Sequence, residues 1–236
     1  MTQLSVRRIL KGAALLSLLA MASCSDSATP AGTGSTAPLV VLFPVAYSAF
    51  DGKNSYKLPA MVDGLTAGIA WTASDPKLVD LAPLADGQVQ VTMKAAGSVK
   101  IIATAGARTG ATKLTILEHT PEEYKAGLDR YTKGSGAGNT GAGQPCANCH
   151  GETGIQHSPQ QTGGFTEDEL RDIIRAGKLP QAIVDKYGEN EMWHQLHQWS
   201  GSESEITGLV VFLRSLAPKS QGAKIDFGRG SPEFAK

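Results

Sequence analysis

Residues 146–150 read Cys-Ala-Asn-Cys-His, and this stretch determines how the second half of the chain is interpreted. In a helical conformation Cys146 and Cys149 lie about one turn apart, and His150 follows directly. Two thiols at this spacing add to the two vinyl groups of a haem, and the adjacent imidazole then ligates the iron. The sequence therefore predicts one covalently bound haem c, with His150 as the proximal ligand.

Two other kinds of site also use a Cys-x-x-Cys pair. A thioredoxin-like redox pair requires a βαβ surround, and the residues around this motif do not show that alternation. A zinc site requires two further ligands, and the remaining cysteine, Cys24, belongs to an N-terminal targeting segment. We therefore expect haem attachment rather than either alternative.

The sequence on both sides of the motif predicts three helices. The first begins at Thr120-Pro121-Glu122-Glu123, which supplies a cap and a proline at the first helical position. A middle helix follows the pair Thr166-x-x-Glu169 and ends at Gly177. The last helix, residues 205–216, is amphipathic and is introduced by the capping box Ser202-x-x-Glu205.

With these helices, the motif resembles a class I, monohaem cytochrome c domain over residues 119–218, which implies an all-α fold for this part. The resemblance implies that the first and last helices cross, with Gly127 allowing a close approach to the Phe212-Leu213 region. It also implies a proline carbonyl that accepts the Nδ1–H of His150, and Pro159 is the candidate.

The second iron ligand is expected from the loop before the last helix, residues 192–199. The family resemblance favours Met192, whose thioether raises the potential, although Trp193 follows it where the family usually has proline. His197 is the alternative and would give bis-His ligation with a lower potential, and His194 is also within reach. Trp199 is expected to line the haem crevice and to donate its indole N–H to a propionate. The other histidines are expected at the surface: His119 and His157.

A different pattern occupies residues 39–118, where short alternating runs are separated by turn signals. Val89, Val91 and Met93 alternate with polar residues, and the dipeptide Asp-Gly recurs at 86–87 and at two earlier places. Several short strands with regular turns predict an antiparallel β-sandwich. The whole chain is therefore expected to be multidomain, with a sandwich followed by the helical part.

The same region resembles a bacterial immunoglobulin-like domain of group 2, on the residues 70–76 (Ala-Trp-Thr-Ala-Ser-Asp-Pro) and 95–104. This resemblance implies an Ig-like sandwich whose task is spacing or adhesion. Trp71 is expected to be the core aromatic residue between the two sheets rather than a binding residue.

The N-terminus carries an export signal. Three basic residues precede an apolar run over 13–22, which predicts a signal peptide over residues 1–23. Met21-Ala22-Ser23-Cys24 resembles a lipobox, which implies lipidation of Cys24 and an exported, membrane-anchored lipoprotein in the periplasm, outer membrane or cell surface. Cleavage by ordinary signal peptidase is the alternative. Residues 24–38 are expected to form a flexible tether, and 219–236 a tail without assigned function.

Charge gives no sign of a nucleic-acid partner. The chain has 22 basic and 22 acidic side chains, and removal of residues 1–23 leaves 19 basic against 22 acidic. The expected function is electron transfer by haem c to and from other redox proteins, without enzyme activity. The alternatives are a haem peroxidase, a gas or redox sensor, or a surface adhesion protein that carries a haem domain.

Overall fold

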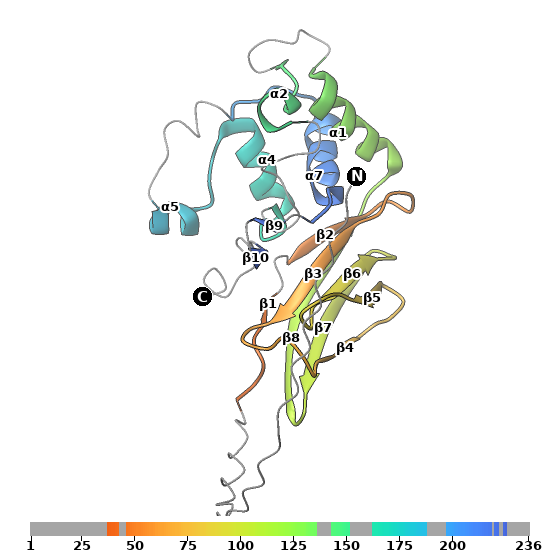
Figure 1. Ribbon diagram of the computed structural model, residues 1–236. Helices are drawn as coiled ribbons and strands as arrows, with labels where there is room; N and C mark the ends of the chain where they lie inside the picture. Colours follow the sequence, from red (N-terminus) through yellow and green to blue (C-terminus); the bar gives the residue numbers. More distant parts are fainter. Residues whose placement is uncertain are drawn as a thin grey trace, which may run out of the picture. The chain divides into compact units, whose positions relative to one another are not determined.

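The computed structural model describes residues 37–42, 46–135, 143–151, 162–187, 197–218, 220–221 and 224–225. These residues belong to one compact unit, Thr36–Lys236. Its first half consists of strands, and helices follow (Figure 1). The signal peptide with Cys24, and nearly all of the expected tether, lie outside the described residues.

Two four-stranded sheets form the first half. One sheet has the order β1-β3-β6-β5 and contains β1 (Val41–Leu42), β3 (Lys57–Val62), β6 (Val89–Met93) and β5 (Val79–Pro83). The other has the order β2-β8-β7-β4 and contains β2 (Tyr47–Phe50), β8 (Arg108–Glu118), β7 (Gly97–Ala105) and β4 (Ala70–Ala73).

The strand order is that of an immunoglobulin-like sandwich. We count β1 and β2 as the two parts of a divided first strand A and letter the later strands B to G along the chain. The order of strands across the two sheets is then A-B-E-D and A-G-F-C. Neighbouring strands are antiparallel except β2 and β8, which run parallel with Tyr47 opposite Thr115. The predicted Ig-like β-sandwich is therefore confirmed.

The sandwich core comes from the alternation that the sequence shows. Val89, Val91 and Met93 of β6 are buried, and they share one apolar cluster with Ile101 and Leu114 of the opposite sheet. Each strand therefore directs alternate side chains into the space between the sheets.

Trp71 lies on β4 and packs against the sandwich core while remaining half-buried. Its indole N–H donates to the carbonyl of Gly87 at 2.9 Å, which ties β4 to the turn before β6. This agrees with a structural role for Trp71, because its polar atom is satisfied inside the domain.

The helical half contains α1 (Pro121–Lys133), α2 (Ala147–His150), α4 (Glu167–Ala176), α5 (Gln181–Tyr187) and α7 (Glu203–Ser215). The predicted capping box at Ser202 is present, the helix starts predicted at Thr120 and Thr166 are capping boxes as well, and α4 ends at Gly177 in the left-handed conformation. Within the expected tail, β9 (Ser220–Gln221) and β10 (Lys224–Ile225) pair antiparallel.

Helices α1 and α7 lie side by side and touch through glycine, as predicted for Gly127 (Figure 1). A Cβ on Gly127 would lie 1.8 Å from the carbonyl oxygen of Gly208, so the backbones are in direct contact. Tyr131 and Phe212 pack beside this contact with ring centroids 4.9 Å apart. Gly208 itself was not anticipated from the sequence.

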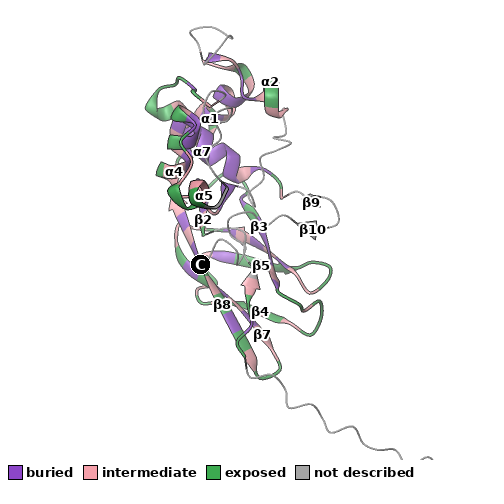
Figure 2. Cartoon of the chain, turned by 90° about the vertical axis from the view of Figure 1, so that its left-hand side faces the viewer, coloured by how far each residue is buried: buried purple, intermediate pink, exposed green. Residues whose placement is uncertain are grey.

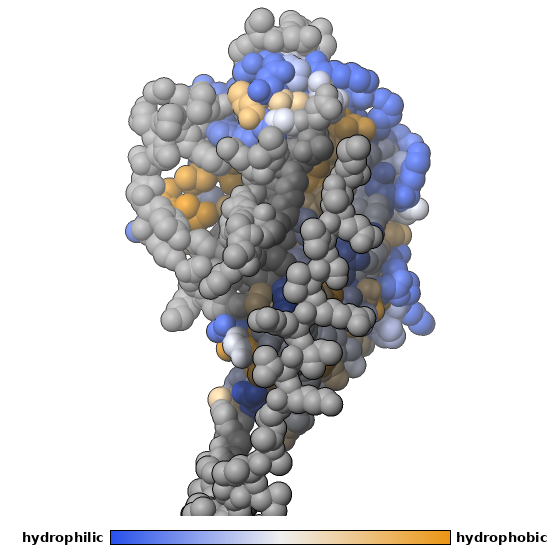
Figure 3. Space-filling view, in the orientation of Figure 1, coloured by the Kyte–Doolittle hydropathy of each residue, from blue (hydrophilic) through white to orange (hydrophobic). Residues whose placement is uncertain are grey.

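The side of α1 that faces away from α7 is hydrophilic (Figure 3). Asp129 there forms ion pairs with Lys125 and with Lys133, each one turn away along the helix. This division into an apolar face and a charged face explains why α1 packs on α7 by one side only.

Helix α7 also joins the helical half to the sandwich, and Figure 2 shows it buried over most of its length. Val211 belongs to the apolar cluster of the sandwich core, and Tyr124 of α1 packs against that cluster. Arg214 is 2% exposed, and its guanidinium donates to the carbonyls of Ser48 (3.2 Å) and Phe165 (3.1 Å). The two halves therefore share a packed boundary.

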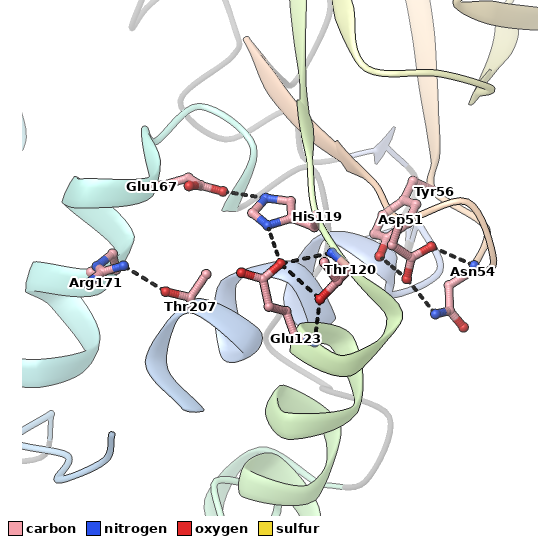
Figure 4. Close-up of polar contacts among 9 residues, drawn as sticks. All are labelled: Asp51, Asn54, Tyr56, His119, Thr120, Glu123, Glu167, Arg171 and Thr207. Atoms are coloured by element: carbon pink, nitrogen blue, oxygen red, sulfur yellow. Dashed lines mark hydrogen bonds and ion pairs between the residues drawn. The ribbon is translucent and has the colours of Figure 1, made fainter. Parts of the chain in front are cut away.

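His119 lies in this boundary, so its interpretation as a surface residue is wrong. Its side chain is 5% exposed, and Nε2 is 2.7 Å from Oε1 of Glu167 at the start of α4 (Figure 4). Nδ1 is 3.4 Å from Oε2 of Glu123 on α1. The residue was misjudged because its burial results from packing between β8, α1 and α4, which no local pattern indicates.

The charges of this cluster predict a pH-dependent stability. Burial opposes the charged form of His119, but Glu167 and Glu123 raise its pKa above the usual 6.5. Burial likewise opposes ionisation of Glu167, but His119 lowers the pKa of Glu167 below its usual 4.5. The ion pair therefore contributes fully between pH 4.5 and 6.5. Its contribution is lost as pH rises through the pKa of His119 or falls through that of Glu167.

Replacement of the histidine by glutamine (H119Q) is expected to lower the free energy of unfolding by about 2 kcal/mol near pH 5.5. The difference from the wild type should shrink at pH 8.5, because the wild-type imidazole is then increasingly neutral. Urea unfolding of both proteins at the two pH values measures this difference in unfolding free energy. Subtracting the variant from the wild type at each pH cancels the contribution of the other titrating groups. A difference that is equal at both pH values would contradict the ion pair.

Candidate functional site

The Cys-x-x-Cys-His motif forms the short helix α2 and the residue before it. Cys146 occupies the N-cap position, and its carbonyl accepts hydrogen bonds from the amides of Cys149 (3.2 Å) and His150 (3.0 Å). Both cysteines are free thiols, Cys146 buried and Cys149 exposed. The helical spacing predicted for the two sulfurs is therefore present.

Side chains from the last turns of α1 hold the residues on either side of α2. The hydroxyl of Tyr131 donates to the carbonyl of Gly151 at 2.9 Å. Nη1 of Arg130 donates to the carbonyl of Gln144 at 2.8 Å. Both donors lie on the buried face of α1, so the position of the motif depends on the packing of α1 against α7.

A second segment, residues 197–200, precedes α7 and is held by α4 and by α1. The amide of Trp199 donates to the carbonyl of Ile174 at 3.1 Å, and the Trp199 side chain is buried in the helical core. The carbonyl of Ser200 accepts from Nε (3.3 Å) and Nη2 (3.1 Å) of Arg130. The Arg130 guanidinium carbon also lies 5.5 Å from the centre of the Trp199 ring.

These contacts bring two histidines together. The rings of His150 and His197 have centroids 6.1 Å apart and planes inclined by 42°. Two imidazoles that ligate one metal ion from opposite sides, each at about 2 Å, have ring centres about 6 Å apart. The spacing of this pair therefore fits an iron between the two rings, and the adjacent free thiols fit covalent haem attachment.

The other predicted ligands are not placed. Met192 and His194, and the proline candidate Pro159, lie outside the described residues. Trp199 is buried, and it packs in the helical core with Cys146.

Electrostatics at the motif oppose the thiolate form of Cys146. Burial raises the pKa of Cys146 to about 11, whereas a redox-active cysteine in such a pair has a lowered pKa. Burial lowers the pKa of His150, and the neighbouring His197 lowers it further. The His150 imidazole is therefore neutral at neutral pH, which is the protonation state that binds a metal.

Some features are absent from the part of the chain that the structure describes. There, no group of three or more His, Cys, Asp or Glu side chains converges in a way that would hold a metal ion. No described helix combines the length and apolar character needed to cross a membrane.

Sequence reasoning missed Arg130, whose guanidinium donates hydrogen bonds to both segments of the site. Its signal was present, because Gly127, Arg130 and Tyr131 follow the i, i+3, i+4 spacing of one helical face and are all buried. An arginine on such a face is easily assigned to the surface, since its charge is costly to bury without partners.

Comparison with known proteins gives matches among solved structures only. No protein-family model matches the chain, and no curated protein does. The twitchin kinase region from C. elegans matches with a TM-score of 0.28 and 11% identity, over 34% of this chain and 16% of that chain. The M1 domain of titin has a TM-score of 0.28 and 9% identity, with 35% and 95% covered. The Dscam1 Ig7 domain has a TM-score of 0.24 and 18% identity, with 34% and 98% covered.

Proposed function

We propose that this chain is an exported electron carrier with one haem c, attached through Cys146 and Cys149 and ligated by His150 and His197. The observation that carries the proposal is the 6.1 Å separation of the two imidazole rings beside two free thiols. Of the three candidates for the second ligand, His197 is the one that a described geometry supports. In this proposal the helical half is a class I cytochrome c domain.

The surrounding residues suit such a carrier. A bound haem would supply one-electron chemistry by cycling between ferrous and ferric iron. His150 and His197 would be neutral nitrogen ligands, and bis-His ligation favours a lower potential than His–Met ligation. Trp199 and the helical core would exclude water from one side of the site and lower its dielectric constant, which also tunes the potential.

The rest of the chain would place this carrier outside the cytoplasm. In the proposal the sandwich is a group 2 bacterial Ig-like domain that acts as a spacer, and a lipid on Cys24 anchors the protein to a membrane. Other redox proteins would be the partners. This arrangement is supported by the sequence resemblances and by the Ig-like strand order of the sandwich.

Covalent attachment is tested by extraction of the purified protein with acid acetone. The protein, produced with a haem-maturation system, is expected to keep its pigment, because thioether bonds survive this treatment. The double variant C146A/C149A is expected to lose it, whereas N148A, an exposed position within the motif, should keep it. Pigment that is extracted from the wild type, or no pigment at all, would refute the haem proposal.

The second ligand is tested by near-infrared magnetic circular dichroism. The wild-type protein and M192A are both expected to show the charge-transfer band of bis-His iron, and H197A is expected to lose it. If M192A changes the band and H197A does not, the methionine is the ligand.

A six-coordinate resting state without peroxide turnover would favour electron transfer over the peroxidase alternative.

A further inference from the structure

Arg130 is the side chain that connects the two halves of the candidate haem site. It is 1% exposed and lies on α1, which carries neither a cysteine of the motif nor a candidate iron ligand. Its guanidinium donates to the carbonyl of Gln144, just before the motif, and to the carbonyl of Ser200, just after His197. One planar group therefore spans both segments.

The geometry of arginine suits this role. A guanidinium presents several N–H donors in a fixed planar fork, so carbonyls bound on different edges are held at a fixed separation. The ring of Trp199, 5.5 Å from the guanidinium carbon, restricts the plane further. A lysine in this position would bring a single mobile ammonium group and would not reproduce the bridge.

Two further hydrogen bonds each hold one of the segments. Tyr131 fixes the end of α2 through Gly151, and Ile174 fixes the second segment through the amide of Trp199. Neither of these contacts relates one histidine to the other. Among the hydrogen bonds described here, those of Arg130 join the two segments, and they act together with the packing of Trp199 and Cys146 in the helical core.

We propose that Arg130 is a positioning residue that sets the separation of His150 and His197 and so keeps both imidazoles on the iron. The proposal rests on the haem function proposed above. Loss of the bridge would let residues 197–200 move away from the motif, which would open the second coordination position. The potential would then rise, and small external ligands would gain access.

The test compares the holoproteins of the wild type, R130K, R130M and a matched control, R171M. Arg171 is a partly buried arginine of α4, and its described hydrogen bonds go to Thr207 and Glu203 of α7 rather than to either segment. The measurements are acid-acetone-resistant haem, the spin state of the ferric form, and the rate of carbon monoxide binding to the reduced form. Far-UV circular dichroism reports folding.

We expect all four proteins to retain covalent haem, which separates this test from the test of haem attachment. Loss of a residue that orients the ligands of a metal site commonly costs about tenfold to a hundredfold in metal affinity or activity. R130M should therefore show a high-spin fraction and carbon monoxide binding faster by about tenfold or more. R130K should fall between R130M and the wild type, and R171M should match the wild type.

The proposal fails if folded R130K and R130M keep the low-spin spectrum and the wild-type rate of carbon monoxide binding. It also fails if neither variant folds, because Arg130 would then be required for the fold as a whole. A wild-type protein without covalent haem would instead overturn the proposed function.

Discussion

Replacement of Gly127 by alanine is expected to lower the free energy of unfolding by about 3 kcal/mol, since overpacking at a backbone contact lies at the high end of its usual cost. The new Cβ would lie 1.8 Å from the carbonyl oxygen and 2.0 Å from the carbonyl carbon of Gly208. Both atoms belong to the backbone of α7, so no rotamer change can relieve the clash. The helices would have to separate.

The higher helix propensity of alanine acts in the opposite direction, but its effect on stability is smaller than the steric cost. Alanine is favoured over glycine inside a helix by about 0.5–1 kcal/mol. Separation of α1 and α7 would also weaken the packing of Tyr131 on Phe212, and it would move Arg130, which lies on the same face. The steric term therefore exceeds the propensity term.

Urea unfolding of G127A at equal haem content measures this effect, and G201A is the matched control. A Cβ on Gly201 would meet the flexible end of Ile206 at 3.2 Å, so we expect a change within about 0.5 kcal/mol. If G127A proved as stable as the wild type, the backbone contact between the two helices would be wrong.

Replacement of Arg214 by methionine is expected to lower the free energy of unfolding by about 2–4 kcal/mol, because it leaves two inward-facing carbonyls without their donor. These are the carbonyls of Ser48 in β2 and Phe165 before α4. Burial lowers the pKa of Arg214 to about 10, so the group is still charged at neutral pH. Its charge also supports the ionised form of Glu167.

A methionine of similar length would remove the cost of burying a cation, and this effect alone would make the loss of unfolding free energy smaller. That gain is realised only when all partners are replaced together by apolar groups, and here the acceptors remain. R175M is the matched control, because Arg175 forms an exposed ion pair with Glu203, and such pairs contribute about 0–1 kcal/mol. A loss for R214M no larger than that for R175M would contradict the role of Arg214.

Local features of this fold could be predicted from the sequence. The three helix starts and the alternation in β6 depend on residues within a few positions of each other, and each appears where it was expected. The spacing of Cys146 and Cys149 is local in the same sense.

Features that depend on packing between distant elements could not be predicted. His119 and Arg214 carry charge, which usually indicates the surface, and both are buried by partners that lie far away in the sequence. The proximity of His197 to His150 has the same origin. The segment before α7 shows no periodicity that would favour one candidate ligand, and the family resemblance alone had favoured Met192.

The packed boundary formed by Val211, Tyr124 and Arg214 has a consequence for cooperativity. Because α7 contributes to the interior of the sandwich, neither half can melt without exposing apolar surface of the other. Calorimetry should therefore record one heat-absorption peak rather than two. A truncated chain that begins after β8 would leave Val211 facing solvent and Arg214 without Ser48, so the helical half should be handled together with its sandwich.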